Sequence, residues 1–307
     1  MIGIRPVETD ADIDTYLDVR NRVHPQTPMP REAVLDQRRL PGNLDLVATL
    51  DLEPVGVATT AEFGGMPGGD LAYLTIRVLR DERRKGVGTA LHLRASERAR
   101  SLGKERFYAV VRHDDAGSRG YYAHRGFEEV GRMQDVALDL SKVAFRPEVP
   151  EGLELVPATE AHERGAYAVA LEADADIPSG EQIRSGTFEQ WRDRNFGPLA
   201  IRELSFVALA GRRVVGYALL HRHGEDTAEH AMTGVARAFR GRGIALALKQ
   251  AQVAAAKEAG WAFLRSQNDL GNAPMRRINE KLGYERRFEW IHLTGPLLES
   301  GDPAPPG

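Results

Sequence analysis

RRKGVG, residues 83–88, returns 157 residues later as RGRGIA, residues 240–245. The spacing is kept downstream, where further glycines of the first half are matched by glycines of the second half. Several glycines in register over a long stretch indicate an internal duplication, because a chance repeat would not keep its spacing. The sequence therefore predicts two copies of one fold. The matched glycine pairs are Gly86 and Gly243, Gly103 and Gly260, and Gly126 and Gly283.

The duplication divides the 307-residue chain into two predicted domains. We predict the first domain over residues 1–146 and the second over residues 153–300. The connecting residues 147–152 contain Pro and Gly, which predicts a linker. The end of the chain, residues 301–307, consists mostly of Pro, Gly and Ala, and we predict that it is disordered.

Composition limits the classes of function. The hydrophobic share of 42% is enough for packed cores, and the net charge of −3 lacks the basic excess of a general nucleic-acid binder. No run approaches the roughly 18 apolar residues needed to span a bilayer, and residues 1–10 lack the features of a signal peptide. The chain has no cysteine, which excludes disulfides and thiolate chemistry. We expect a cytoplasmic protein, monomer or homodimer, without nucleic-acid or membrane partners.

Hydrophobic patterning places strands and helices in the same order in both halves. That order predicts an α/β (α+β) fold in which each half has a mixed, mostly antiparallel sheet flanked by helices. In the first half we predict strands at 45–50, 55–62, 71–78 and 107–111, a helix at 87–102 and another ending near 125. In the second half we predict strands at 204–209, 214–220, 229–235 and 262–265 and a helix at 244–259.

Each repeated loop follows a predicted strand and opens a predicted helix. Glycines let backbone N–H groups approach an anion, and a helix N-terminus supplies unpaired donors with partial positive charge, so the loop can bind a phosphate. The arginines and lysine add charge. The alternative is a tight strand-to-helix turn with solvated arginines. Neither loop matches the glycine pattern of a Rossmann site or the G-K-[ST] of a P-loop.

Two motifs in each half resemble the GCN5-related N-acetyltransferase (GNAT) family. The pattern V-x-x-x-x-R-x-x-G-x-[GA] occurs at 78–88 and at 235–245, and a second pattern, N-x-x-A-x-x-L-Y-x-x-x-G-[FY], is loosely matched at 115–127 and 272–284. These segments carry the resemblance, and most of the remaining chain follows it loosely. The tandem layout resembles mycothiol synthase-like actinobacterial acetyltransferases. The resemblance implies two tandem GNAT domains.

In that family the loop holds the pyrophosphate of acetyl-coenzyme A (acetyl-CoA), so the resemblance implies this cofactor and its binding residues. In the first half these are Val78, Leu79, Arg83, Arg84, Lys85, Gly86, Val87, Gly88 and Thr89. In the second half they are Val235, Ala236, Arg240, Gly241, Arg242, Gly243, Ile244, Ala245, Asn268 and Asn272.

The resemblance also assigns catalytic positions, but the two halves match it differently. In the family a tyrosine at the position of Tyr122 protonates the departing thiolate; its alternative here is a core aromatic. The second half has Asn279 at that position, and an amide is no Brønsted acid, although it can donate a hydrogen bond. Conversely, Asn272 matches the family's asparagine, whereas the first half has Asp115.

The general base is less clear. Many members use a carboxylate four positions before the valine, where this sequence has Leu74 and Ala231. Glu229 lies two residues further back on the same face of its strand and could act through water; its alternative is a solvated glutamate at a strand end. Glu62 and Asp70 are weaker candidates in the first half.

Two further groups of residues are open to more than one reading. His221, His223 and His230 could suggest a metal, but without cysteines or a matching carboxylate set we predict surface histidines and no metal.

The variable segments before the central strands would select the acceptor. In the second half acidic and aromatic groups would suit a cationic amine, although the aromatics could equally be core residues. These segments contain Glu172, Asp174, Asp176, Ile177, Pro178, Ser179, Phe188, Trp191 and Phe196 in the second half, and the Pro-rich loop 24–30 in the first.

The combined prediction is an acetyl-CoA-dependent N-acetyltransferase that acts on a small-molecule primary amine by direct transfer. One half catalyses and the other is degenerate or structural, with a slight preference for the second half as the catalyst. The alternatives are a non-catalytic CoA-binding or regulatory module, and aminoacyl transfer from a charged tRNA on a related tandem fold.

Overall fold

In the computed structural model, residues 1–63, 69–143, 146–177 and 185–299 are described. They form two compact units. The first unit contains Met1–Val130 and the segment that begins at Trp290, and the second unit is Gly131–Glu289. The predicted tail at 301–307 lies outside the described residues.

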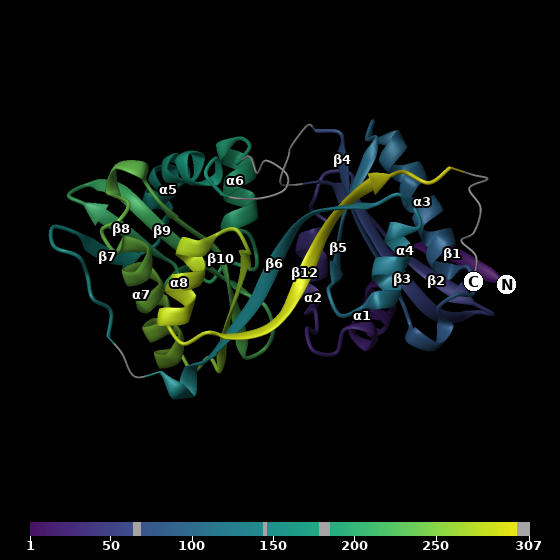
Figure 1. Ribbon diagram of the computed structural model, residues 1–307, viewed down its shortest axis with the longest axis horizontal. Coiled ribbons are helices and arrows are strands. Elements are labelled where there is room, and N and C mark those ends of the chain that lie inside the picture. Colours follow the sequence, from purple (N-terminus) through teal and green to yellow (C-terminus); the bar gives the residue numbers. More distant parts are fainter. Residues whose placement is uncertain (64–68, 144–145, 178–184, 300–307) are drawn as a thin grey trace. The chain divides into compact units, whose positions relative to one another are not determined.

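The first unit is built on one mixed sheet (Figure 1). Its strands follow the order β1-β2-β3-β4-β5-β12 and are antiparallel except for the parallel pair β4 and β5. The strands are β1 (Ile2–Pro6), β2 (Leu44–Leu50), β3 (Glu53–Glu62), β4 (Leu71–Val78), β5 (Arg106–Arg112) and β12 (Glu285–Pro296).

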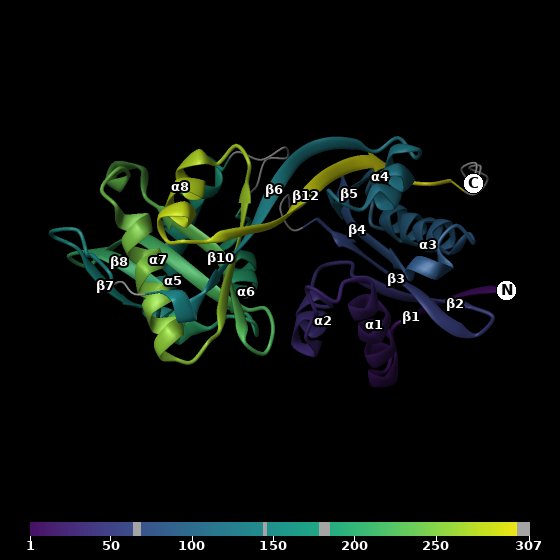
Figure 2. The same ribbon diagram turned by 60° about the horizontal axis from the view of Figure 1, so that its bottom comes forward.

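Helices cover both faces of this sheet (Figure 2). They are α1 (Asp10–Val23), α2 (Arg31–Gln37), α3 (Val87–Ser101) and α4 (Ala116–Ala123). Alternation along β2 explains the two layers, because successive side chains of a strand point to opposite faces. Val47 packs in the cluster of α1 and α2, whereas Leu46 and Ala48 pack in the cluster of α3.

The second unit repeats this architecture. Its sheet order is β7-β8-β9-β10-β11-β6, again antiparallel except for one pair, β10 and β11. Its strands are β7 (Glu154–Pro157), β8 (Phe206–Ala210), β9 (Arg213–Arg222), β10 (Thr227–Val235), β11 (Phe263–Asp269) and β6 (Glu128–Asp139). Its helices are α5 (Glu160–Asp174), α6 (Phe188–Asn195), α7 (Ile244–Glu258) and α8 (Ala273–Lys281).

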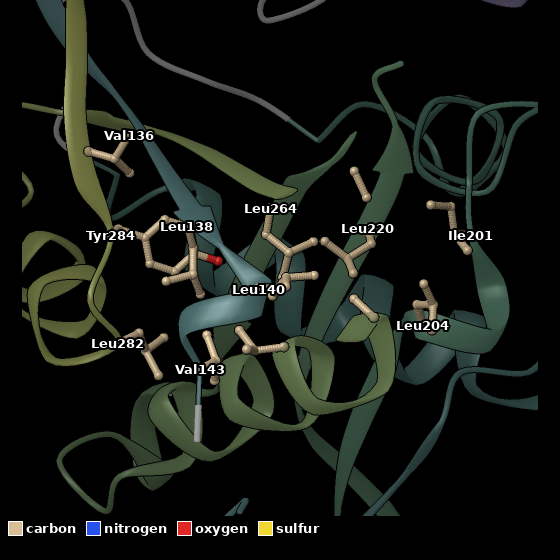
Figure 3. Close-up of a cluster of buried hydrophobic side chains, with 13 residues drawn as sticks. Val136, Leu138, Leu140, Val143, Ile201, Leu204, Leu220, Leu264, Leu282 and Tyr284 are labelled. Atoms are coloured by element: carbon tan, nitrogen blue, oxygen red, sulfur yellow. The ribbon is translucent and has the colours of Figure 1, made fainter. Parts of the chain in front are cut away.

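A hydrophobic core lies under α7 in the second unit (Figure 3). Leu138 and Leu140, at the end of β6 and just after it, meet Leu264 of β11 and Leu220 of β9 in this cluster. Each of these side chains is buried. The last strand of the first sequence half is therefore part of the core of the second unit.

The predicted α/β fold with two mixed, mostly antiparallel sheets is confirmed. The strand at 71–78 has the predicted bounds. The strand predicted at 204–209 begins later, at Phe206, because Arg202–Leu204 forms a 3-10 turn. The strand predicted at 262–265 continues to Asp269, because β6 pairs with it from Phe263 to Asp269, beyond the residues that pair with β10.

The two final strands are exchanged between the units. β6 begins in the first unit and continues into the second, where it pairs with β11. β12 begins in the second unit and continues into the first, where it pairs with β5 (yellow in Figure 1). The compact units therefore differ from the predicted domains 1–146 and 153–300, although the predicted linker at 147–152 contains no helix or strand. The patterns that predicted two halves carry no signal for which sheet receives each final strand.

Candidate functional site

Each sheet opens where its parallel strands separate. In the first unit β4 pairs with β5 only from Leu71 to Leu74, and in the second unit β10 pairs with β11 only from Thr227 to Glu229. Beyond these residues the register between the two strands ends, while each strand continues toward its C-terminus. The repeated basic loop follows directly after this opening in both units.

The loop of the second unit leaves a helix N-terminus open. Gly241 and Gly243 adopt φ values of 76° and 79°, a left-handed conformation that favours glycine. α7 has no side-chain cap and no acidic residue in its first turn, so no side chain uses its first N–H groups. A Cβ added at either glycine would meet no atom within 4 Å. The space beside this turn can therefore admit an anion.

The loop of the first unit has the same path but less room. Arg84 takes the place of Gly241 and is left-handed with φ 62°, which costs a non-glycine residue roughly 1–2 kcal/mol. A Cβ at Gly86 would lie 3.3 Å from Ile2, and one at Gly88 would lie 3.4 Å from Tyr121. α3, like α7, lacks a side-chain cap.

The predicted cofactor arginines Arg83 and Arg240 hold the loops in shape. Arg83 Nε donates to the carbonyl oxygen of Val78 at 3.2 Å, and Arg240 Nε donates to that of Val235 at 3.0 Å. Each arginine therefore ties the loop back to the end of its own strand. Among the other predicted cofactor residues, Lys85 pairs with Glu82, Arg242 donates to Ala238, Thr89 accepts from Arg125, and Asn268 donates to Ser266.

Asp115 makes the two loops different. Arg83 donates to both carboxylate oxygens of Asp115 at 3.1 Å, and Asp115 also caps α4 through Ser118 N at 3.0 Å. Burial raises the pKa of Asp115, but these hydrogen bonds outweigh it and bring the pKa to about 2. In the second unit Asn272 caps α8 through Met275 N, so the loop is not tied to α8 by an ion pair. The Arg83–Asp115 pair crosses from loop to helix in the first unit only.

Asp176 takes the role of a loop anchor in the second unit. Its carboxylate pairs with Arg237 at 2.8 Å and with Arg240 at 2.7 Å, from the end of the α5 segment. Glu172 accepts a hydrogen bond from the backbone N–H of Arg237. These acidic residues, which are candidate contacts for a cationic acceptor, therefore bind the basic loop.

The aromatic residues of the same segment are core residues. Trp191 is buried in the cluster formed by α5 and β9, with Phe188 and Phe196 packed against it. This supports the core reading of the three aromatics. Of the other positions considered for acceptor contact, Asp174 is buried and accepts from Ser185, and Pro178 and Ser179 lie outside the described residues.

A β-bulge in β10 interrupts the strand pairing at the opening of the second unit. The register with β9 shifts between His230 and Met232, which leaves Ala231 without a cross-strand partner, and the pairing with β11 has already ended at Glu229. In the first unit the corresponding residue, Leu74, pairs with β3 and with β5 without interruption. The bulge distinguishes the two units, and no side-chain pattern in the sequence indicates it.

Tyr122, the predicted acid, lies in the hydrophobic core of the first unit. It is 4% exposed and packs edge-on against Phe127, with ring centroids 4.8 Å apart. Burial raises the pKa of Tyr122 well above its usual value. Its neighbour Tyr121 links α4 to α3 by donating to the carbonyl oxygen of Gly88 at 2.9 Å. This packing agrees with the core alternative for Tyr122.

Asn279 occupies the corresponding position in the second unit and is different in character. It is 2% exposed, and neither atom of its amide group has a hydrogen-bond partner. Burying an amide without partners costs about 1–3 kcal/mol. Its donor and acceptor are therefore available to a bound group.

Glu229, the predicted base, belongs to a partly buried charge cluster. It lies 3.0 Å from His223 Nδ1 and 3.7 Å from Arg265 Nη1. Burial raises the pKa of Glu229, but Arg265 and His223 lower it to about 2. Arg265 also pairs with Asp135 of β6. A carboxylate stabilised in this way is a poor proton acceptor near neutral pH, so the geometry does not support the role of base.

The three histidines considered as metal ligands do not face one another. His221 Nε2 contacts the carbonyl oxygen of Asn195, His223 lies beside Arg265, and His230 contacts Gln252 and Tyr284 on the other side of β10. Within the described part of the chain, no group of three or more His, Cys, Asp or Glu residues is placed to hold a metal ion. In the same part, no helix is both long and apolar enough to cross a bilayer.

The sequence matches the model of the acetyltransferase (GNAT) family twice, over residues 12–127 and 165–284. The chain belongs to the GNAT acetyltransferase family. The two matches confirm the predicted tandem arrangement of GNAT domains. No curated protein matches the sequence.

Solved GNAT structures share this fold over nearly the whole chain. A GCN5-related N-acetyltransferase from Sphaerobacter thermophilus has a TM-score of 0.77 at 19% identity and covers 98% of this chain and 97% of its own. A tandem GNAT protein from the clavulanic acid biosynthesis pathway has a TM-score of 0.78 at 21% identity, covering 98% of this chain and 100% of its own. The likeness to mycothiol synthase is not confirmed and stays a prediction.

Proposed function

We propose that this GNAT protein is an acetyl-CoA-dependent N-acetyltransferase of a small-molecule primary amine, and that its second unit is the catalytic one. The observation that carries the proposal is the bulge at Ala231, just beyond the last residue of β10 that pairs with β11 and on the strand that leads to the uncapped start of α7. The first unit has an unbroken strand at the same place.

The residues of the second unit fit the cofactor. The open space beside Gly241 and Gly243 and the uncapped N–H groups of α7 would hold the pyrophosphate, with Arg242 adding charge. In the first unit the corresponding loop has less room, since Arg84 stands in place of Gly241 and a Cβ at Gly86 would lie 3.3 Å from Ile2. The first unit is therefore assigned a structural role in acetyl transfer.

Acetyl-CoA, when bound, supplies the activated acetyl group. The Ala231 N–H would donate to the acetyl oxygen as it gains negative charge during attack by the neutral amine; removal of one such donor in other enzymes costs about 100- to 1000-fold in rate. The orphaned amide of Asn279 would donate a hydrogen bond to the departing sulfur. The proton lost by the amine would pass through water to the departing thiolate, since the Glu229 carboxylate, with a pKa of about 2, is a weak base.

The test measures free thiol release from acetyl-CoA against a panel of primary amines. Gly243→Asp places a carboxylate at the start of α7 and is expected to abolish acetyl-CoA binding and turnover. Gly211→Asp is the matched control, since Gly211 is also left-handed, with φ 60° and open space around it, but lies in the turn between β8 and β9. Gly86→Asp, in the first unit, is expected to leave turnover within about twofold.

Two results would contradict the proposal. Loss of turnover in Gly86→Asp with normal turnover in Gly243→Asp would make the first unit the catalyst. Acetyl-CoA binding to the wild type without turnover on any amine would favour a non-catalytic CoA-binding module.

A further inference from the structure

Hydrogen bonds hold the Pro-rich loop at residues 24–30 against α1 in the first unit. Asn21 exchanges two hydrogen bonds with the backbone of Met29, at 2.8 and 3.2 Å. Arg20 donates to the carbonyl oxygen of Thr27 and is only 7% exposed. The loop is therefore held in a defined position beside the C-terminus of α1, where acetyl transfer by the second unit gives it no role.

Three arginines lie near the first residue of this loop, and one of them, Arg112, pairs with Asp114. The pKa of His24 falls to about 3, first because the side chain is buried and then because Arg77, Arg20 and Arg112 lie near it, with Asp115 acting in the opposite direction. His24 is therefore neutral, and it offers a hydrogen bond without adding to the positive charge of its neighbours.

The cluster lies at the open end of the first sheet. Arg77 is on β4 beyond Leu74, where the pairing with β5 has ended, and Arg112 is the last residue of β5, opposite Trp290 of β12. Gln26 of the loop reaches to 3.5 Å from Arg112, and His24 packs edge-on toward Trp290, with ring centroids 6.4 Å apart. The loop, the two diverging strands and β12 thus meet around the guanidinium groups.

One hydrogen-bond donor of the Arg77 side chain has no partner. Its Nη1 donates to Thr75 at 2.9 Å, but its Nε is buried without a hydrogen-bond partner. Among the residues that the structure describes, no carboxylate forms an ion pair with Arg77. A buried donor on a charged group is costly when unpaired, and an arginine fork matches a carboxylate or phosphate well. A carboxylate or phosphate would satisfy this donor and match the charge of the guanidinium.

We propose that the first unit binds a small carboxylate- or phosphate-bearing ligand beside Arg77 and His24, under the loop 24–30. The site is specific to this unit, because the positions 157 residues further on are Gly234 and Asp269 in place of Arg77 and Arg112. The proposal does not depend on acetyl transfer by the second unit. It gives the unit without the bulge a binding function of its own.

The test titrates the full chain with inorganic phosphate and, separately, with malonate, at constant ionic strength. Calorimetry measures the affinity and thermal unfolding measures the stabilisation. Arg77→Gln is expected to weaken binding at least tenfold, about the loss of one charge-assisted contact. Arg94→Gln is the control, because Arg94 is an exposed arginine of α3 in the same unit that pairs with Glu97. It should bind like the wild type.

Each anion reports on one source of the ligand. Tighter binding of phosphate indicates a phosphorylated ligand, and tighter binding of malonate a carboxylate. If Arg77→Gln does not fold, Arg77→Lys keeps the charge but loses the fork and is expected to bind about tenfold more weakly than the wild type. Equal binding by the wild type and the folded Arg77 variant, or no binding of either anion by the wild type, overturns the proposal, whatever the result for acetyl transfer.

Discussion

The carboxylate of Asp135 on β6 pairs with the guanidinium of Arg265 on β11, 130 residues further along the chain. Both side chains are almost completely buried, at 0% and 4% exposure. The carboxylate comes from the first half of the sequence, and the guanidinium comes from the second half. The second unit therefore depends on a strand that its own half of the sequence does not contain.

Replacing Asp135 with Asn is expected to destabilise the second unit. The change leaves the Arg265 guanidinium buried beside Glu229 alone, at 3.7 Å, and breaking a buried pair on one side costs about 3 kcal/mol. Urea unfolding followed by circular dichroism measures the loss. Glu128→Gln is the control, because Glu128 is exposed at the start of the same strand. An unchanged unfolding midpoint in Asp135→Asn would show that Glu229 is a sufficient partner for Arg265.

Cutting the chain in the linker is expected to unfold both pieces. The fragment 153–300 lacks Val136, Leu138 and Leu140, which are buried in the core under α7. The fragment 1–146 lacks Ile291 and Leu293, which are buried against β5. Loss of one buried aliphatic side chain costs roughly 2–5 kcal/mol, so the loss of a strand exceeds the stability of a small domain.

Circular dichroism of each purified fragment and of an equimolar mixture provides the measurement. The separate fragments should lack cooperative thermal unfolding, and mixing should restore it by re-forming both sheets. A fragment that unfolds cooperatively on its own would mean that its own final strand can fold back to complete its sheet.

The duplicated glycines and the alternating strands were sufficient to predict both sheets and both loops, because these features depend on local geometry. The loops at Gly86 and Gly243, for example, lie directly before α3 and α7, as the sequence predicts. The strand exchange could not be predicted, because both final strands carry buried aliphatic residues, such as Leu138 and Leu293, and this pattern does not specify which sheet a strand joins. The bulge at Ala231 was also hidden, since an extra residue in a ladder changes backbone pairing and not composition.

The candidate site shows the same division. The sequence located the loops, but the arginines that it assigned to the cofactor bind the ends of their own strands, as Arg240 does with Val235. The sequence of a glycine loop does not indicate whether its basic side chains point to solvent or bind backbone carbonyl oxygens of the protein. The ion pairs of Glu229 and Asp176 likewise depend on residues far away in the sequence.

Asn279→Leu is expected to stabilise the protein and to impair its activity. The amide is buried with both polar atoms unpaired, so an apolar side chain of similar size removes a cost of about 1–2 kcal/mol. The same change removes the proposed donor to the sulfur and should lower kcat by roughly tenfold or more. Urea unfolding and thiol release measure the two effects. Glu280→Gln, an exposed neighbour on α8, should change neither. A stabilised variant with full activity would exclude Asn279 from the site.

Lys249→Met is expected to stabilise the protein, and to do so most at low pH. Lys249 is 1% exposed on α7, with its ammonium 5.4 Å from the ring centroid of Tyr284, and burial lowers its pKa to about 7 from an ordinary value of 10.5. His230 beside it stays neutral, because burial and the charge of Lys249 lower its pKa well below the usual value. The fold therefore accommodates an amine that prefers to be charged in water.

The sign of the pH dependence follows from the proton count. Between pH 7 and 10.5 the unfolded chain holds a proton on Lys249 that the folded chain has lost, so the free energy of unfolding rises with pH. Below pH 7 both states are protonated, and the penalty is constant and largest. The gain from Lys249→Met should be about 5 kcal/mol at pH 6–7 and should fall by roughly 1.4 kcal/mol per pH unit toward pH 10.

Urea unfolding of the wild type and Lys249→Met at pH 6, 7, 8 and 9 measures the difference, which cancels the titration of other groups. Lys281→Met removes an exposed lysine of α8 and should give a small difference that does not change with pH. A difference for Lys249→Met that is equally flat would mean that the Lys249 ammonium keeps its ordinary pKa in the folded protein.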